Sequence, residues 1–461
     1  MTIPPIAGDS LDSQLARASN YIVNYWWPTK RGYPTSGIPA LTWTVVSGNP
    51  GTTAYNQELA VRGAAMNAFT LAVPLFTGSY NEWSVSIGTP SMVQRLYAAK
   101  LIVMCARQHL AATTPLSGAQ TWGHSWQSPL WAAYVGLAAL CGWYDLIPNT
   151  VDRNNVLAMI ESECEYVLGL NTDFWQVPSG TGYVDGPNTL NPNDGPTRSG
   201  NSAAEELSWN AAVLWVGSAL MPLHPHAETW KTKAVELNVC AFSSPFDLNS
   251  STMVYGQTVS AWIAGRGYNV DSLDRVTNHQ RIHPDYMTTI TQNLFGWVAR
   301  AISGLTTPVG VAWNFNFVYR ALQVSALDLS GTTAYDPSTA RIKFPDTTPT
   351  SDWGSRRPAA YACFDGLNML FVDVFDSLLD QDGRTGTIWP AAYWLALHSG
   401  DSSNMQLRAT SATHAYGAFV DTSVSPAEAT YPEEEAYAAS QLAFLRLAQY
   451  LKYNRPDLWE D

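Results

Sequence analysis

The sequence predicts an all-α fold in a single domain, and three observations support this prediction. Apolar residues recur with the 3.6-residue period of a helix along most of the 461-residue chain. Alternation typical of β-strands is confined to two short stretches, 253–259 and 340–344. No low-complexity tract and no clean linker interrupts the sequence. We therefore expect one domain over residues 1–461.

Local signals indicate where several of the helices begin. Pro129 and Pro284 lie near the start of two periodic segments, where the missing N–H of proline costs no hydrogen bond. Ser202 and Glu205 have the spacing of a capping box. The glutamate run at 433–435 is expected to be a solvated first turn that complements the helix dipole. In chain order, the expected helices are residues 9–26, 54–76, 91–112, 127–146, 151–169, 202–220, 225–241, 285–303, 311–326, 365–380, 388–398 and 427–453.

Long connections separate some of these helices. The segments 171–201, 242–283 and 327–364 are rich in Gly, Pro, Asn, Asp and Trp. Long loops inside a compact chain are usually functional. We therefore expect the binding surface to form where these connections gather.

Composition excludes some classes of partner. The net charge of −13 argues against nucleic-acid binding, which needs a basic surface. No run of about 18 apolar residues is present, so we expect no membrane span. Charged residues make up 14% of the chain, against an average of about 25%. This favours a secreted or periplasmic protein whose leader has been removed, with a cytoplasmic location as the alternative.

Cysteine usage and the known catalytic motifs indicate neither a metal nor a cofactor. The five cysteines show no CxxC spacing and lie mostly in apolar helical segments, so we expect buried free thiols. The chain contains no P-loop, no GxGxxG after a strand, no HExxH and no GxSxG. A calcium ion held by loop carboxylates stays open as an alternative.

The 19 tryptophans point to a flat, amphipathic ligand. A sugar packs its C–H face on an aromatic ring, so tryptophans along a cleft suit a carbohydrate. Trp122, His124 and Trp126 precede an expected helix and have the residue types of a sugar subsite. The alternative is an aromatic cluster with a purely structural role.

The segment 202–210 supplies the first candidate catalytic group. The capping box explains Glu205 but not Glu206, which opens a nearly all-apolar helix. A carboxylate at the mouth of a buried helix can be tuned as a general acid or base. Residues nearby on the helix or on the preceding loop are expected to contact substrate: Glu205, Trp209, Asn210, Asp185 and Arg198.

The segment 277–287, "TNHQRIHPDYM", supplies the second candidate. Asn278, His279 and Arg281 lie on the loop before the helix that Pro284 begins, and Tyr286 lies in its first turn. These side chains can neutralise a carboxylate, remove a proton and donate one. The alternative is a surface loop that merely caps the helix.

The number of helices, the long connections and the abundant aromatics resemble the (α/α) toroid enzymes, which include many polysaccharide lyases and glycoside hydrolases. The resemblance implies an (α/α)6-like or (α/α)7-like toroid of helical hairpins with long cleft-forming loops. It also implies β-elimination on a uronic-acid-containing glycan. Asn278 and Arg281 would neutralise the substrate carboxylate, His279 would be the base, and Tyr286 the acid or base.

Other functions stay open beside the lyase. A glycoside hydrolase would use Glu206 with a loop aspartate, Asp185 or Asp194. A non-catalytic glycan-binding or helical scaffold protein would need neither set. An isoprenoid cyclase is more distant, because residues 373–382 match an aspartate-rich motif only loosely. The concentration of Asn, His, Arg and Tyr favours the lyase.

Overall fold

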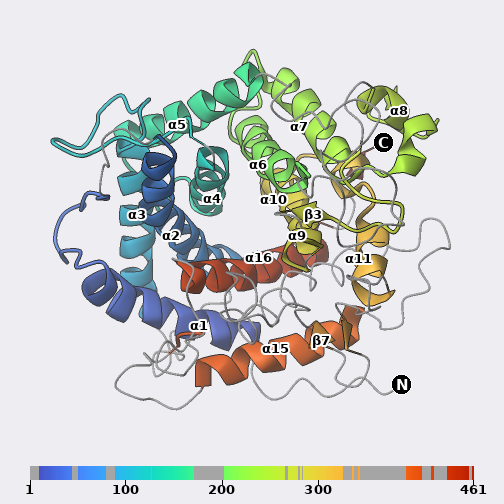
Figure 1. Ribbon diagram of the computed structural model, residues 1–461. Helices are drawn as coiled ribbons and strands as arrows, with labels where there is room; N and C mark the ends of the chain where they lie inside the picture. Colours follow the sequence, from blue (N-terminus) through green and yellow to red (C-terminus); the bar gives the residue numbers. More distant parts are fainter. Residues whose placement is uncertain are drawn as a thin grey trace.

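The computed structural model is predominantly helical, which confirms the predicted all-α class (Figure 1). The structure describes residues 10–43, 50–78, 89–125, 127–170, 202–264, 268–278, 281–282, 284–324, 335–336, 341–342, 391–407, 417–419, 433–455 and 459–460. Within these ranges, the strands are two residues long. Helix packing therefore builds the core.

The longer helices are α1 (Leu11–Tyr21), α2 (Pro50–Thr77), α3 (Ser91–Arg107), α4 (Ser128–Cys141), α5 (Thr150–Gly169), α6 (Ala204–Leu220), α7 (Ala227–Phe242), α10 (Phe295–Ile302), α11 (Phe315–Val324), α15 (Ala391–Leu407) and α16 (Glu434–Asn454). Short helical pieces are the π-helical η1 (Ile22–Lys30), η4 (Pro245–Asn249), α8 (Val259–Trp262), α9 (Pro284–Thr288), η5 (Thr289–Leu294) and η6 (Val309–Ala312). The paired strands are β1 (Met253–Val254) with β2 (Gln257–Thr258), β3 (Thr277–Asn278) with β4 (Arg281–Ile282), β5 (Thr307–Pro308) with β8 (Trp459–Glu460), and β6 (Tyr335–Asp336) with β7 (Arg341–Ile342).

The expected helices that fall on described residues are present, with one clear difference. The segment predicted as a single helix over 285–303 consists of α9, η5 and α10. Thr289 Oγ1 donates to the Tyr286 carbonyl at 2.6 Å, and Thr291 Oγ1 donates to the Thr288 carbonyl at 2.8 Å. Such side-chain bonds compete with helical backbone bonds, which explains the interruption. The expected helix 365–380 lies outside the described residues.

The helix starts predicted at Pro129 and Pro284 are confirmed, whereas the capping box predicted at Ser202 is wrong. Pro129 lies in the first turn of α4, and Pro284 begins α9. Helix α6 begins after Ala203, and the buried Ser202 hydroxyl has no hydrogen-bond partner. The Ala203 N–H instead donates to Oδ1 of Asn269, 2.9 Å away. A side chain from a distant loop therefore holds the start of α6, where the sequence predicted a capping box.

Among the described helices, a series of contacts returns to its starting point. Helix α2 packs against α4, α4 against α6, α6 against α10, α10 against α16, and α16 against α2. Figure 1 shows these helices in the middle of the molecule, with α1, α5, α7 and α15 around them. We call these five helices, each of which contacts the next in the series, the central helices.

Four aromatic rings from different central helices form a closed series of contacts. Phe69 of α2 lies 5.8 Å from Tyr134 of α4, and Tyr134 lies 5.0 Å from Phe295 of α10, between ring centroids. Phe295 lies 4.6 Å from Phe444 of α16, which in turn lies 5.9 Å from Phe69. Such pairs add about 0.5–1.5 kcal/mol each beyond area burial. This aromatic cluster therefore joins helices that are far apart in the sequence.

Two pairs of neighbouring central helices, α6 with α10 and α2 with α16, run parallel. Gly296 of α10 packs on Trp215 of α6, and Arg300 Nη1 lies 3.4 Å from the Ser218 hydroxyl, so both numberings rise together. Helices α2 and α16 are also parallel, because Glu433 packs on Gly63 near one end and Tyr450 lies beside Phe76 near the other.

The surrounding helices run the other way. Trp215 of α6 donates to Asn238 of α7 at 2.7 Å, whereas Gly217 packs on Trp230. The numbering of α7 therefore falls as that of α6 rises. Helix α5 is likewise antiparallel to α4, with Glu163 beside Ser128 and Ile160 beside Gly136.

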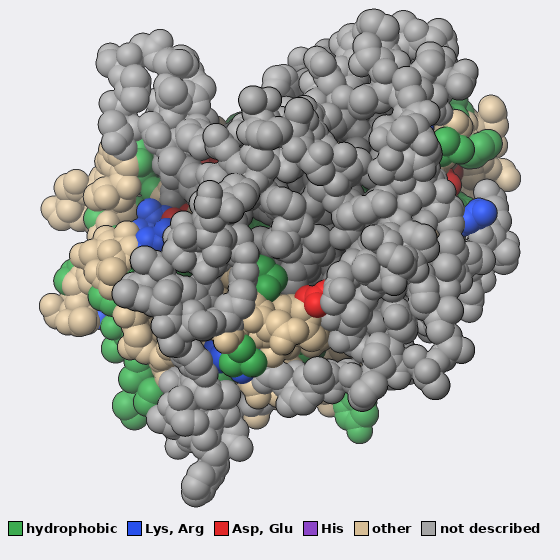
Figure 2. Space-filling model, turned by 60° about the horizontal axis from the view of Figure 1, so that its bottom comes forward, with side chains coloured by type: hydrophobic (Ala, Val, Ile, Leu, Met, Phe, Trp, Pro, Cys, Tyr) green, Lys and Arg blue, Asp and Glu red, His purple; other side chains and the backbone are tan. Residues whose placement is uncertain are grey.

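Charged side chains are few on the face that Figure 2 presents, where they lie scattered among apolar and uncharged ones over the described atoms. Within the described part of the chain, no helix combines the length and apolarity that a membrane span needs. Four of the cysteines are buried free thiols, as predicted: Cys105, Cys141, Cys164 and Cys240. Cys363 lies outside the described residues.

Candidate functional site inside the ring of central helices

A buried ion pair faces the interior of the central helices. Arg62 Nη1 lies 2.5 Å from Glu58 Oε1 on the same face of α2, and Phe69 follows two helical turns after Arg62. Glu58 is fully buried and Arg62 is 9% exposed. Burying a charge is unfavourable unless it is paired, so this position is held at an energetic cost.

Tyr134 lies next to this pair. Its hydroxyl accepts a hydrogen bond from Gln441 Nε2 at 3.3 Å. Burial raises the pKa of Tyr134 to about 12, against the lowering effects of hydrogen bonds with Ser440 and Gln441 and of the Arg62 charge. The guanidinium therefore acts on the phenol, and the phenol stays protonated at neutral pH. A protonated phenol beside a cation can bind an anionic group and donate a proton.

The sequence did not single out Glu58, Arg62 or Tyr134. A signal for the first two is present in the segment 57–73, "QELAVRGAAMNAFTLAV", which is otherwise nearly devoid of charge. A Glu and an Arg one turn apart in such a helix indicate a buried pair. Nothing in the sequence near Tyr134 distinguishes it from the other tyrosines.

Glu433 holds the start of α16 against two other elements. It is buried and adopts a left-handed backbone conformation, with φ of 68°. Trp26 Nε1 donates to its Oε2 at 2.8 Å, Arg31 pairs with its Oε1, and Gly63 lies beneath it. A non-glycine residue in this conformation costs of the order of 1–3 kcal/mol. The prediction of a solvated glutamate run at 433–435 is therefore wrong, since Glu435 is buried as well.

Glu206 carries a carboxyl group whose pKa is strongly shifted. Burial raises its pKa to about 7, whereas a backbone hydrogen bond acts to lower it. Its Oε2 is shielded from solvent and has no hydrogen-bond partner. Glu206, Asn210 and Gly217 recur at helical spacing, and Gly217 packs on Cys164 of α5 and Trp230 of α7. This face of α6 turns toward the surrounding helices, so Glu206 is separate from Arg62 and Tyr134.

The other candidates on α6 are mostly in the core. Trp209 is 1% exposed and Asn210 is 2% exposed. Neither presents an open face for a sugar, contrary to their expected role as substrate contacts, because α6 is packed on all sides along this stretch. The Oδ1 atom of Asn210 is buried without a partner. Glu205 is partly buried in the first turn of α6.

The expected sugar subsite around Trp122 and His124 is a structural cluster instead. Trp122 is buried, and its Nε1 donates to the Cys105 carbonyl at 2.9 Å. The His124 ring stacks on Tyr166 of α5 with 4.7 Å between centroids, and its backbone N–H donates to Glu163 Oε1 at 2.8 Å. These contacts tie the loop before α4 to α5, so the alternative of a structural role fits better.

Residues 277–278 and 281–282 pair as the antiparallel strands β3 and β4, called the hairpin below, and α9 begins at Pro284. Asn278 and Arg281 are paired across β3 and β4, with residues 279–280 between them. Tyr286 is 4% exposed. Helix α10 runs parallel to α6, and η5, which precedes α10, also contacts α6. Because α9 and the hairpin come before η5 in the chain, we infer that they lie toward the end at which α6 begins. His279, Trp126, Asp185, Asp194 and Arg198 lie outside the described residues.

Neither a metal site in the described ranges nor a match to a known protein indicates the function. In the described ranges, no group of three or more His, Cys, Asp or Glu side chains is arranged to hold a metal ion. No protein-family model, curated protein or solved structure matches this chain. The function therefore has to be argued from the geometry of the site.

Proposed function

We propose that the chain is an (α/α) toroid enzyme that cleaves a uronic-acid-containing glycan by β-elimination. The closed series of contacts among the central helices supports the toroid, as do their parallel neighbours and the antiparallel helices around them. In such a toroid the inner helices all point the same way. The hairpin 277–282 and the Arg62–Tyr134 pair then share one mouth.

The observation that carries this proposal is the cation held beside a protonated phenol inside the ring. Arg62, with Asn278 and Arg281, neutralises the substrate carboxylate, which makes the C5 proton more acidic. His279 removes that proton, and the electron pair forms a C4–C5 double bond while the C4–O bond breaks. Tyr134 donates its proton to the leaving oxygen and regains one from solvent. Tyr134 thereby takes the acid role first assigned to Tyr286, because Tyr134 lies beside the Arg62 guanidinium.

The test is incubation of the protein with a panel of uronate-containing and neutral polysaccharides. Ultraviolet absorbance reports the new double bond, and a reducing-end assay reports all cleavage. We expect both signals together on uronate polymers. Replacing Tyr134 by Phe removes one proton donor and is expected to lower kcat at least about a hundredfold, whereas Tyr144→Phe, at a 73% exposed site, leaves it unchanged. Full activity of Tyr134→Phe would remove this residue from the mechanism.

A glycoside hydrolase is the second candidate, and the carboxyl group of Glu206 favours it. A pKa of about 7 suits a general acid at neutral pH. Its partner would be a loop aspartate, Asp185 or Asp194, outside the described residues. Reducing ends without ultraviolet absorbance, abolished by Glu206→Gln, would establish this alternative. Neither signal on a broad panel would favour a non-catalytic glycan-binding or scaffold protein.

We also infer that the protein works outside the cytosol, in the periplasm or after secretion. The low charged fraction of 14% supports this inference. Fractionation of the source cells tests it: recovery in the cytosolic fraction alone would contradict it.

A further inference from the structure

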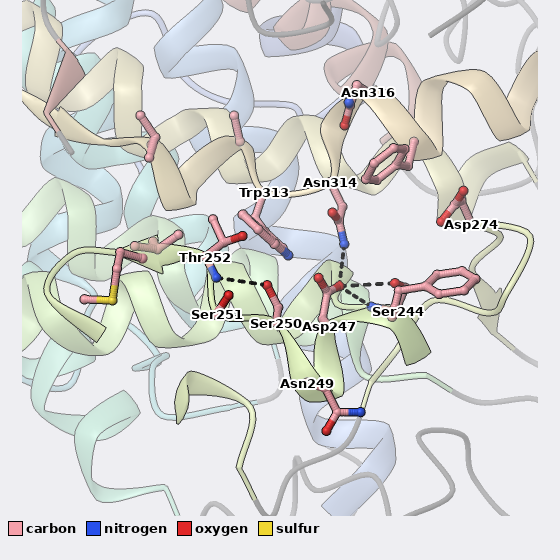
Figure 3. A pocket seen from close by; sticks show the side chains of 16 residues that line it. Ser244, Asp247, Asn249, Ser250, Ser251, Thr252, Asp274, Trp313, Asn314 and Asn316 are labelled. Carbon is pink, nitrogen blue, oxygen red and sulfur yellow. Dashed lines mark hydrogen bonds between the residues drawn. The ribbon is translucent and has the colours of Figure 1, made fainter. Parts of the chain in front are cut away.

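A cavity lies beside the C-terminal end of α7, where Asn314 donates to the Phe242 carbonyl. Residues of η4, the β1 strand, η6 and the start of α11 line it (Figure 3). Its volume is about 600 Å³, within the roughly 300–1,000 Å³ typical of small-molecule sites. Gly310 of η6 packs on Val235 and Val239 of α7, which fixes the cavity against a surrounding helix.

A carboxylate with one occupied oxygen forms the floor of this cavity. Asp247 Oδ2 accepts hydrogen bonds from the Ser244 N–H at 2.7 Å, the Ser244 hydroxyl at 3.2 Å and Asn314 Nδ2 at 2.8 Å. No donor reaches its Oδ1 atom from the described residues. Asn314 also donates to the Phe242 carbonyl at 2.8 Å and has φ of 57°. The orientation of Asp247 is therefore fixed before any ligand binds.

Unused polar groups surround this carboxylate. The indole N–H of Trp313 is shielded from solvent and has no hydrogen-bond partner among the described residues. Its nitrogen lies on the side of the ring that faces Asp247 and Ser250 (Figure 3). The amide of Asn316 lines the same cavity, and no described residue hydrogen bonds to it. A buried polar group without a partner is unfavourable, and a ligand with hydroxyl groups would supply one.

The charge of the lining selects the class of ligand. Among the described residues, the lining contains Asp247 and Asp274 but no Lys, Arg or His. A phosphate or a uronate would meet no counter-charge there. The hydroxyl and amide side chains match a neutral ligand rich in hydroxyls, and the exposed Phe246 and Met253 offer it an apolar rim.

We propose that this cavity binds an uncharged sugar, as a carbohydrate site that shares no lining residue with the Arg62–Tyr134 pair. Asp247 Oδ1 and the Asn316 amide bond the sugar hydroxyls, and the Trp313 N–H donates to one of them. The site carries no catalytic group and takes a different sugar class from the ring interior. It does not depend on the proposed lyase activity.

Titration of the full chain with uncharged disaccharides, namely maltose, cellobiose, xylobiose and lactose, tests this proposal by saturation-transfer NMR and calorimetry. We expect at least one to bind. Trp313→Phe and Asn316→Ala, which each remove a hydrogen-bonding group from the lining, are expected to weaken binding about five- to tenfold. The matched control Trp143→Phe alters a partly buried tryptophan at the end of α4 and is expected to bind like the wild type.

Two results would overturn the proposal: no binding of any uncharged disaccharide at millimolar concentration, or binding that Trp313→Phe and Asn316→Ala leave unchanged. A preference for glucuronate over glucose would overturn it too. Failure of the proposed lyase activity is visible separately: the wild type would then form no double bond on uronate polymers, whereas disaccharide binding would be unaffected. Tyr134→Phe is expected to lower double-bond formation without changing disaccharide binding. The cavity variants are expected to cleave short uronate oligosaccharides at the wild-type rate.

Discussion

The ring interior and the cavity lined by Asp247 differ in the charge of the side chains that they present. Inside the ring, Arg62 and Glu58 form an ion pair that is nearly excluded from water. In the cavity, Asp247 is the fixed carboxylate, and the described lining residues include no cation. A buried guanidinium selects for an anionic group, whereas a lining without a cation selects for neutral hydroxyls. The difference indicates that the two regions take chemically distinct ligands.

The largest expected effect concerns the buried ion pair. Arg62→Met removes the guanidinium that pairs with the buried Glu58 carboxylate. We expect it to lower the free energy of unfolding by about 3–5 kcal/mol, measured by urea denaturation. The exposed pair of Arg95 with Asp145, 3.5 Å apart, provides the control, and Arg95→Met is expected to cost about 0–1 kcal/mol. Equal losses of unfolding free energy in Arg62→Met and Arg95→Met would contradict the burial of the Arg62–Glu58 pair.

A smaller effect, with a definite sign, concerns the pH dependence of Glu206. Its pKa rises from 4.5 unfolded to about 7 folded, so the folded state holds the proton more tightly. The resulting stabilisation is complete below pH 4.5 and is lost as the pH rises toward 7. The loss is up to about 3 kcal/mol.

Urea denaturation at pH 4.5 and pH 8 measures this contribution. The fall in stability between the two pH values is expected to be smaller in Glu206→Gln than in the wild type. Asp145→Asn, at an exposed site, should leave the fall unchanged. An identical fall in Glu206→Gln and in the wild type would contradict the burial of this carboxyl group.

The smallest expected effect separates the cavity floor from its rim. Ser244→Ala removes a hydroxyl that bonds Asp247 Oδ2 at 3.2 Å and is expected to cost about 0.5–1.5 kcal/mol in unfolding free energy. Phe246→Ala, at a 66% exposed rim position, is expected to stay within about 0.5 kcal/mol of the wild type. Thermal denaturation measures both. A larger loss in Phe246→Ala would show that the rim, and not the floor, holds the cavity together.

Periodicity predicted the helices well because apolar spacing reflects burial directly. It failed at 285–303, where threonine hydroxyls bond nearby carbonyls and interrupt a pattern that still looks helical. It also failed at Glu433, whose partners Trp26 and Arg31 lie about 400 residues away in the sequence. Local spacing carries no information on such contacts.

The candidate site was predictable only in part. The segment 277–287 attracted attention through its side chains, and the structure adds the hairpin and its position near the start of α6. Arg62 and Tyr134 meet because α2 and α4 both contribute to the ring interior, which no local motif encodes. Trp122 and Trp209 show the converse, since tryptophans in promising contexts proved to be buried core residues.

The most direct test of the central claim is a crystal structure of Tyr134→Phe with a uronate oligosaccharide bound. We expect the uronate carboxylate to lie within salt-bridge distance of the Arg62 guanidinium, with the scissile oxygen facing residue 134. An oligosaccharide bound with its carboxylates remote from Arg62 would contradict the assignment of the ring interior as the site of β-elimination.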